Sequence, residues 1–315
     1  WANDISSDKR DIYVENFGDR DFWLGDIWDV VENSEIIPND AFLYTASFPC
    51  TDLSVAGNRA GLAGKQSGTL NAFINILRNK KELGTAPEVV LLENVRGFLT
   101  SHKGEDVRQT VKYFSELGYF VDIIELDAID FSAQSRPRVF LIAVQESLAL
   151  QTMKIKKSSE LFNNWWIEFE SNPTLRSKKI KDIILSSEDL NWGLLDVCAP
   201  EKAGKNLINI IDTEIYDNSD LWWSEDRKEH LYKQMSKNHQ LILDEMVKGS
   251  NFSYGTVYRR MRKGKSMAEL RTDGFAGCLR TPRGGSSKQI VIRAGNGEWS
   301  VRLLTPREYA RLQGV

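Results

Sequence analysis

The chain has 315 residues, of which 41% are hydrophobic and 27% are charged. This composition excludes a disordered chain, and the length is enough for one large hydrophobic core or two modest ones. A formal net charge of −3 gives no overall sign of nucleic-acid binding. No apolar run approaches the ~20 residues that span a bilayer and no signal peptide opens the chain, so we expect a soluble, cytoplasmic protein. The three cysteines and three histidines show no metal-ligand spacing, so we expect no metal site.

Strand-like and helix-like segments alternate along the first ~145 residues, which predicts an α/β domain with a mostly parallel sheet. The apolar runs that predict strands are 41–47, 88–92, 120–126 and 139–144. The run at 88–92 is continuous enough to predict a strand that is buried on both faces. The segments with helical spacing are 69–81 and 104–117, and Gly118 is a suitable residue to end the second helix.

The composition changes after Glu146. Residues 217–247 predict one or two amphipathic helices. Residues 254–293 then contain ten basic residues and only two acidic ones. Such an excess can follow a phosphate backbone, or it can be an ordinary solvated face. We interpret 147–290 as a smaller inserted domain, after which the chain returns to the first domain.

We expect the candidate catalytic residues to lie at the carboxyl ends of the predicted strands, where open α/β sheets bind their ligands. Cys50 follows the first strand within Phe48-Pro49-Cys50, and a lone cysteine at such a place is more often packing than catalysis. Glu93 and Asn94 end the next strand. Arg136 and Arg138 introduce a later strand and are two residues apart, hence on one side of an extended chain.

These motifs, in this order, resemble the cytosine-5 DNA methyltransferases of bacterial restriction-modification systems. The catalytic motifs of that family are matched by the Pro-Cys loop, by Glu-Asn-Val at 93–95 and by Gln-x-Arg-x-Arg at 134–138. Residues 302–314 resemble the ninth motif, and three shorter segments resemble the second, third and fifth motifs, at 3–5, 25–27 and 68–70. The first and tenth motifs would lie before Trp1 and after Val315, so we expect a sequence trimmed at both ends, with a naturally split enzyme as the alternative.

The resemblance covers residues 1 to about 145 and 270–315, and it implies a fold and a domain division. The fold is a Rossmann-like S-adenosylmethionine-dependent methyltransferase sheet with an inserted target-recognition domain. The catalytic and cofactor-binding domain would be 1–146, the target-recognition domain 147–290, and the return to the catalytic domain 291–315.

The resemblance also implies a mechanism for methylating carbon 5 of cytosine. Cys50 would attack carbon 6 as a thiolate, which makes carbon 5 able to accept a methyl group. Glu93 would act at N3, and Arg138 would stabilise negative charge at O2, with Arg136 supporting it nearby. Asn94 and Ser54 would support the Pro-Cys loop.

The implied methyl donor is S-adenosylmethionine, and the implied product is S-adenosylhomocysteine. Acidic residues would bind the ribose and the adenine of the cofactor. Apolar residues would flank the adenine and line the methionine part. These residues are Asp4, Ile5, Asp26, Ile27, Pro49 and Leu70. Without the family, Asp4 and Asp26 would be interpreted as ordinary loop carboxylates.

The implied partner is duplex DNA, from which the target cytosine must be flipped out. Donor side chains in a glycine-rich segment at the end of the inserted domain are expected to contact it. They are Arg280, Thr281, Arg283, Ser286, Ser287 and Lys288. We further expect a monomer in the bacterial cytoplasm, associated with the nucleoid and working beside a cognate restriction endonuclease.

Three alternative functions are less consistent with the sequence. A transfer-RNA cytosine-5 methyltransferase is disfavoured by the long inserted domain. A catalytically silent DNA-binding relative is disfavoured because Cys50, Glu93 and Arg138 are all present. A nicotinamide-dependent dehydrogenase is disfavoured because no G-x-G-x-x-G follows a strand.

Overall fold

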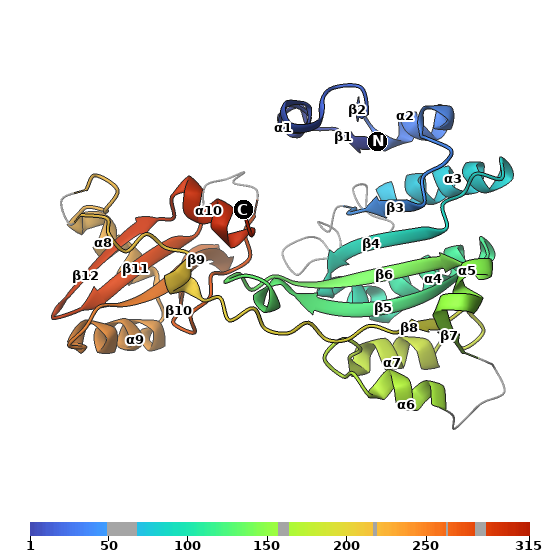
Figure 1. Cartoon of the computed structure of the whole chain (residues 1–315). Coiled ribbons are helices and arrows are strands. Elements are labelled where there is room, and N and C mark those ends of the chain that lie inside the picture. The colour runs from blue at the N-terminus through green and yellow to red at the C-terminus, as the bar shows by residue number, and fades with distance from the viewer. Residues whose placement is uncertain (49–67, 157–163, 217–218, 263, 281–287) are drawn as a thin grey trace. The chain divides into compact units, whose positions relative to one another are not determined.

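The computed structural model describes residues 1–48, 68–156, 164–216, 219–262, 264–280 and 288–315. Packing divides the chain into two units (Figure 1). The first unit comprises 1–126 and 138–199, and the second comprises 127–137 and 200–315. No helix in these described ranges is long and apolar enough to cross a membrane.

A four-stranded sheet with the order β3-β4-β6-β5 forms the centre of the first unit (Figure 1). Its strands are β3 (Leu43–Ala46), β4 (Val89–Val95), β6 (Pro137–Gln145) and β5 (Tyr119–Asp127). β3 and β4 are parallel, whereas β6 is antiparallel to β4. The prediction of a mostly parallel sheet is therefore wrong for this pair. The carboxyl ends of β3 and β4 and the amino end of β6 lie at one edge of the sheet. The predicted location at carboxyl strand ends is therefore wrong for Arg138, which begins the antiparallel strand β6.

Helices α3 (Thr69–Glu82) and α4 (Glu105–Glu116) contribute to the core of this unit. Leu92 on β4, Leu77 on α3 and Val111 on α4 belong to one buried cluster. The other face of β4 is only partly buried, so the prediction of burial on both faces is wrong. Glu93 lies on that partly buried face, near the carboxyl end of β4. Covering the face with apolar residues would bury the charge of Glu93, which is energetically costly.

A second, smaller sheet precedes the central one. Its strands β1 (Ala2–Asp4) and β2 (Phe22–Leu24) are parallel and are joined by α1 (Ser7–Phe17). After β2, Asp26 begins helix α2 (Ile27–Glu32), accepting a hydrogen bond from the backbone N–H of Trp28 at 3.1 Å.

Residues 146–199 pack against the first unit. They form α5 (Glu146–Thr152), β7 (Met153–Ile155), α6 (Asn164–Glu170), α7 (Lys178–Leu185) and β8 (Gly193–Leu195). Asp122 on β5 and Arg176 form an ion pair at 2.6 Å, and each side chain is only 2% exposed. By packing, residues 147–199 thus belong to the first unit, whereas the predicted target-recognition domain begins at 147. The division of the chain by function stays a prediction.

The second unit contains an antiparallel sheet with the order β10-β9-β11-β12. Its strands are β9 (Ser253–Arg262), β10 (Lys265–Arg271), β11 (Ile290–Gly295) and β12 (Glu298–Leu303). Helices α8 (Glu225–Gln234) and α9 (Lys237–Lys248) share a buried cluster with these strands, and α10 (Pro306–Leu312) follows β12.

The turn between β12 and α10 is held by a buried ion pair. Arg302 donates to both carboxylate oxygens of Glu308 at 2.7 Å, and these residues are 1% and 0% exposed. Glu308 also accepts from the backbone N–H groups of Thr305 and Asp212, each at 2.7 Å. Burial alone would raise the pKa of Glu308, but the hydrogen bonds from Arg302, Thr305 and Asp212 hold it below its ordinary value.

Glu308→Gln is expected to lower the free energy of unfolding by about 3–5 kcal/mol at pH 7, because it leaves Arg302 buried without its counter-charge. The lowered pKa means that the stabilisation by Glu308 is complete above the ordinary carboxyl pKa and is lost as pH falls through the folded-state value. Urea unfolding of both proteins between pH 7 and pH 3 measures the difference, which should shrink toward acid pH. A constant difference would contradict the assignment, and Glu229→Gln on exposed α8 is the control, with little expected effect.

The predicted elements are found with small shifts of their ends. The strands expected at 41–47, 88–92, 120–126 and 139–144 are β3, β4, β5 and β6. The helices expected at 69–81 and 104–117 are α3 and α4, and Gly118 follows α4 with a φ of 82°. Residues 217–247 contain two helices, α8 and α9. The predicted α/β class is confirmed.

Candidate active site

An ion pair between Glu93 and Arg138 lies at the edge where β3, β4 and β6 meet. The register pairs Glu93 with Phe140 and Val95 with Arg138, so Glu93 and Arg138 are diagonal neighbours on one face. The Nε of Arg138 lies 2.6 Å from Oε1 of Glu93, and the side chains are 15% and 24% exposed. Both charged groups are therefore held together at the surface of the sheet, where a ligand can reach them.

Asn94 points to the opposite, buried face of β4 and is 3% exposed. Its Nδ2 donates to the backbone carbonyl of Phe48 at 3.3 Å, and its Oδ1 accepts from the N–H of Val95 at 2.8 Å. The ring of Phe48 also packs edge-on against Phe98, with centroids 5.5 Å apart. The end of the β3 segment is thus fixed to the end of β4, immediately before the chain enters residues 49–67.

Arg96 directly follows β4 and begins the 3₁₀ segment η3 (Arg96–Gly104). Its Nε lies 2.8 Å from Oε1 of Glu125 on β5, and the Glu125 side chain is only 6% exposed. This ion pair holds the turn that follows Glu93 and Asn94. Neither residue was predicted, because a pairing across the sheet leaves no local signal in the sequence.

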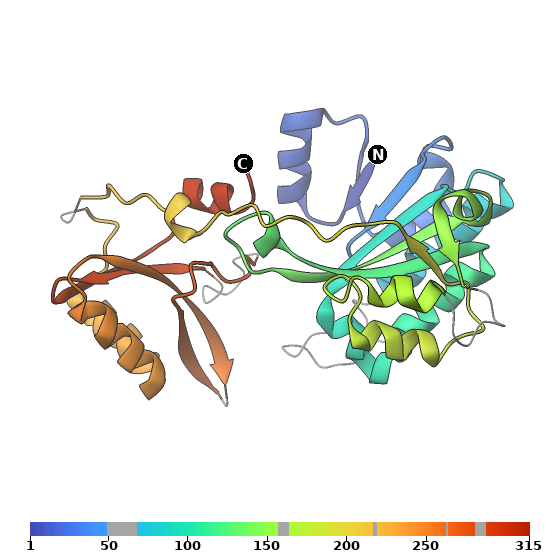
Figure 2. The same cartoon turned by 60° about the horizontal axis from the view of Figure 1, so that its bottom comes forward.

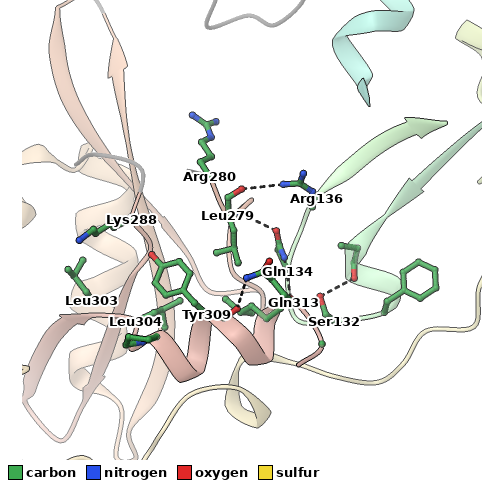
Figure 3. A pocket seen from close by; sticks show the side chains of 15 residues that line it. Ser132, Gln134, Arg136, Leu279, Arg280, Lys288, Leu303, Leu304, Tyr309 and Gln313 are labelled. Carbon is green, nitrogen blue, oxygen red and sulfur yellow. Dashed lines mark hydrogen bonds between the residues drawn. The ribbon is translucent and has the colours of Figure 1, made fainter. Parts of the chain in front are cut away.

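Arg136 belongs to the second unit, unlike Arg138. Its Nη1 donates to the carbonyl of Leu279 at 3.2 Å (Figure 3). The same Nη1 lies 3.5 Å from Sγ of Cys278. Its backbone N–H donates to Asp127 at 2.5 Å. Arg136 is therefore built into the end of the predicted target-recognition segment.

Gln134 connects three segments of the second unit and was not predicted as a site residue. Its Oε1 accepts from the N–H of Leu279 at 3.1 Å, and its Nε2 donates to the carbonyl of Leu312 on α10 at 3.2 Å. The side chain is 4% exposed, so both amide atoms are used inside the fold. Figure 3 shows Gln134 between Leu279 and the end of α10.

A cavity of about 890 Å³ adjoins this network within the second unit. Its lining includes apolar residues of β12 and α10 as well as Arg280 and Lys288, both of which are exposed (Figure 3). The other predicted DNA-contacting residues lie outside the described residues; they are Thr281, Arg283, Ser286 and Ser287. Pro49, Cys50 and Ser54 also lie outside them.

The predicted cofactor residues near the N-terminus come together at the ends of β1 and β2. Asp4 ends β1 and accepts from Lys9 Nζ at 2.6 Å and from the N–H of Ser6 at 2.9 Å. Asp26 follows the neighbouring strand β2 and is exposed. The carboxyl ends of two adjacent parallel strands therefore present two carboxylates at one edge.

The apolar residues predicted to line the cofactor differ in exposure. Ile5 is 73% exposed, whereas Ile27 is partly buried against the core. Leu70, at the start of α3, is 0% exposed and packs inside the core. A role for Leu70 at the methionine part of a cofactor would require its surroundings to open, and it stays a prediction.

A family model described as C-5 cytosine-specific DNA methylase matches residues 1–315. The chain belongs to this family. The resemblance inferred from the motifs is thereby confirmed.

Curated relatives in this family include type II methyltransferases. M.NgoFVII of Neisseria gonorrhoeae is 32% identical over 146 residues, which are 46% of this chain and 37% of that protein. M.HhaI of Haemophilus parahaemolyticus is 27% identical over 191 residues, which are 60% of this chain and 54% of that protein. The chain thus spans about half or less of the length of these relatives.

A crystal structure of the S. pombe Dnmt2 methyltransferase aligns with 99% of this chain and 78% of its own, at 19% identity and a TM-score of 0.49.

Proposed function

We propose that this protein transfers a methyl group from S-adenosylmethionine to carbon 5 of a flipped-out cytosine in duplex DNA, through a covalent adduct of Cys50 at carbon 6. Membership of the C-5 cytosine-specific DNA methylase family supports the reaction class. The observation that carries the proposal is the contact between Glu93 and Arg138 at the carboxyl end of β4.

This contact matches the chemistry of the cytosine ring. N3 and O2 are both attached to carbon 2 of the base, so one carboxyl group and one guanidinium in direct contact can address both atoms. Addition of a thiolate at carbon 6 drives negative charge toward N3 and O2. The Glu93 carboxyl group would share a proton with N3, and Arg138 would stabilise the charge at O2. A catalytically silent relative is disfavoured because Cys50, Glu93 and Arg138 are all present in the chain.

Cys50 is the proposed nucleophile. It follows Phe48 by two residues, so chain connectivity keeps the two Cα atoms within about 7 Å of each other. The backbone carbonyl of Phe48 accepts a hydrogen bond from the side chain of Asn94, which follows Glu93 in the sequence. This anchoring supports an approach of the thiol to the base that Glu93 and Arg138 hold.

We propose that S-adenosylmethionine binds at the carboxyl ends of β1 and β2. Two carboxylates, Asp4 and Asp26, can accept hydrogen bonds from hydroxyl and amino groups of a nucleoside, and the exposed Ile5 offers an apolar surface beside them. When bound, the cofactor supplies the activated methyl group. Ile27, Pro49 and Leu70 are the further residues that we propose around it.

Duplex DNA is the proposed substrate class, and transfer RNA is the alternative. The full-length protein should be incubated with radiolabelled S-adenosylmethionine and either duplex DNA or transfer RNA. We expect label in DNA alone. Label in transfer RNA alone would overturn the DNA proposal and leave the reaction at cytosine in place.

Asn94→Ala is expected to slow methyl transfer by about 10²-fold, because a small displacement of reacting groups is that costly in an enzyme site. It also leaves the buried carbonyl of Phe48 without its partner, which costs about 1–3 kcal/mol of stability. Single-turnover rates and urea unfolding measure the two effects.

Asn79→Ala is the matched control, because the Asn79 side chain donates to the backbone carbonyl of Val31 at 3.1 Å. It should lose stability as Asn94→Ala does, but retain the transfer rate. Equal loss of rate in both variants would show that Asn94 acts through stability alone.

We propose further that the protein acts as a monomer in the bacterial cytoplasm at the nucleoid. A cognate restriction endonuclease would cut the same DNA sequence when it is unmethylated. The names of the type II relatives support this setting.

A further inference from the structure

Asp4, which ends β1, forms an ion pair with Lys9 in the first turn of α1. Both residues belong to the β1-α1-β2 unit, the blue segment that begins at the marked N-terminus in Figure 2. Nζ of Lys9 lies 2.6 Å from Oδ2 of Asp4. Oδ1 of Asp4 accepts from the backbone N–H of Ser6 at 2.9 Å. Each carboxylate oxygen therefore accepts one hydrogen bond from the protein and keeps the capacity to accept another.

The position of Lys9 is not explained by the stability of its helix. The N-terminus of an α-helix carries a partial positive charge, so a cation in the first turn is disfavoured. The side chain of Lys9 is 63% exposed, and an ion pair that is so open to solvent contributes little to stability. Among the described residues, Asp4 is the only hydrogen-bond partner of this ammonium group. An ammonium group has three N–H donors, so Lys9 has donors to offer to a ligand beside Asp4.

Together, the carboxylate of Asp4 and the ammonium group of Lys9 match the chemistry of a vicinal diol. A hydroxyl both donates and accepts, whereas an ionised carboxylate only accepts and an ammonium group only donates. Asp4 alone can therefore bind the protons of the 2′- and 3′-hydroxyls of a ribose, but not their oxygen lone pairs. Lys9 supplies the missing donor at the same place. A 2′-deoxynucleoside, the unit of the DNA substrate, lacks one of these two hydroxyls.

We propose that Lys9 is a further cofactor-binding residue, which donates to a ribose hydroxyl oxygen of S-adenosylmethionine while Asp4 accepts from the ribose hydroxyl protons. The pair thereby favours a ribonucleoside over a deoxyribonucleoside. This inference rests on the proposed function, because it takes the carboxyl ends of β1 and β2 as the cofactor site.

The test measures binding of S-adenosylhomocysteine to the full-length protein by isothermal titration calorimetry, so its readout does not depend on methyl transfer. Lys9→Met keeps the length of the side chain and removes its charge and its donors. It should weaken binding by about 10-fold, the contribution of one hydrogen bond from a charged group. Unchanged binding would overturn the inference. Tighter binding would also overturn it, because it would show that Lys9 competes with the ribose for Asp4.

The 2′-deoxy and 3′-deoxy analogues of S-adenosylhomocysteine identify the hydroxyl that Lys9 contacts. Removal of that hydroxyl should weaken binding to the unaltered protein by about 10-fold more than binding to Lys9→Met, because the variant has already lost the contact. Equal losses in the two proteins for both analogues would overturn the inference.

Arg20→Met is the matched control, because Arg20 is another exposed cation of the β1-α1-β2 unit and its partner is Asp21, at 3.4 Å. It should bind S-adenosylhomocysteine as the unaltered protein does. Equal weakening in Arg20→Met and Lys9→Met would overturn the inference, because it would show a general effect of charge.

Asp4→Asn tests the cofactor site itself and should weaken binding of S-adenosylhomocysteine. If the unaltered protein does not bind this ligand, or if Asp4→Asn binds it equally well, the proposed cofactor site fails. If Asp4→Asn weakens binding and Lys9→Met does not, the inference about Lys9 fails alone. The two failures are therefore distinguishable.

Discussion

Cys50→Ser is expected to abolish methyl transfer to duplex DNA, with a loss of at least about 10⁴-fold in the single-turnover rate. A serine hydroxyl is a far weaker nucleophile than a thiolate at neutral pH, so carbon 6 is not attacked and carbon 5 is not activated. Binding of duplex DNA, measured by fluorescence anisotropy, should remain because the substitution removes no positive charge.

Cys198→Ser is the matched control for this variant, because Cys198 is an exposed free thiol that has no proposed role. It should methylate DNA at the rate of the unaltered protein. Residual transfer in Cys50→Ser within tenfold of the unaltered rate would exclude Cys50 as the nucleophile.

Glu93→Gln is expected to slow methyl transfer by about 10²–10⁴-fold, the usual contribution of a positioned acid or base. The amide keeps the shape of the side chain but cannot exchange a proton with N3. It also weakens the contact at 2.6 Å to Arg138. The affinity for duplex DNA should change little, so the loss appears in the rate at saturating DNA.

Glu88→Gln is the control for charge, because Glu88 is exposed and lies just before the other end of β4. Arg138→Lys adds a test of the pair. Because Glu93 and Arg138 are expected to act as one unit, the double variant should lose little more than the worse single variant. Fully additive losses would show that the two residues act independently.

Much of the first unit could be predicted from local pattern. Its strands are rich in apolar residues and its helices show clear spacing, so β3, β4, β5, β6, α3 and α4 could be predicted. The placement of 147–199 could not be predicted, because it depends on the buried pair Asp122–Arg176, whose partners lie 54 residues apart. The antiparallel direction of β6 depends likewise on tertiary pairing.

In the candidate site, too, some features could be predicted from local sequence and others depend on tertiary contacts. Glu93 and Arg138 could be named as site residues from their motifs, but their direct contact depends on the antiparallel direction of β6 and needed the structure. Gln134 binds Leu279 and Leu312, which are 145 and 178 residues away in the sequence, so its bridging role needs the structure. Arg302 and Glu308 are close in the sequence, but their burial could not be predicted. It involves a contact with a distant segment, in which Arg302 donates to the backbone carbonyl of Asp212.

The central claim, attack of Cys50 on carbon 6, is tested most directly by duplex DNA that contains 5-fluorocytosine at the target site. After the thiolate has added to carbon 6 and carbon 5 has been methylated, the adduct can resolve only by losing a proton from carbon 5. Fluorine cannot leave in place of that proton, so protein and DNA remain joined. We predict a complex that survives denaturing electrophoresis with the full-length protein and with Cys198→Ser, and none with Cys50→Ser. No complex with an unaltered protein that methylates ordinary duplex, or an equal complex with Cys50→Ser, would contradict the account.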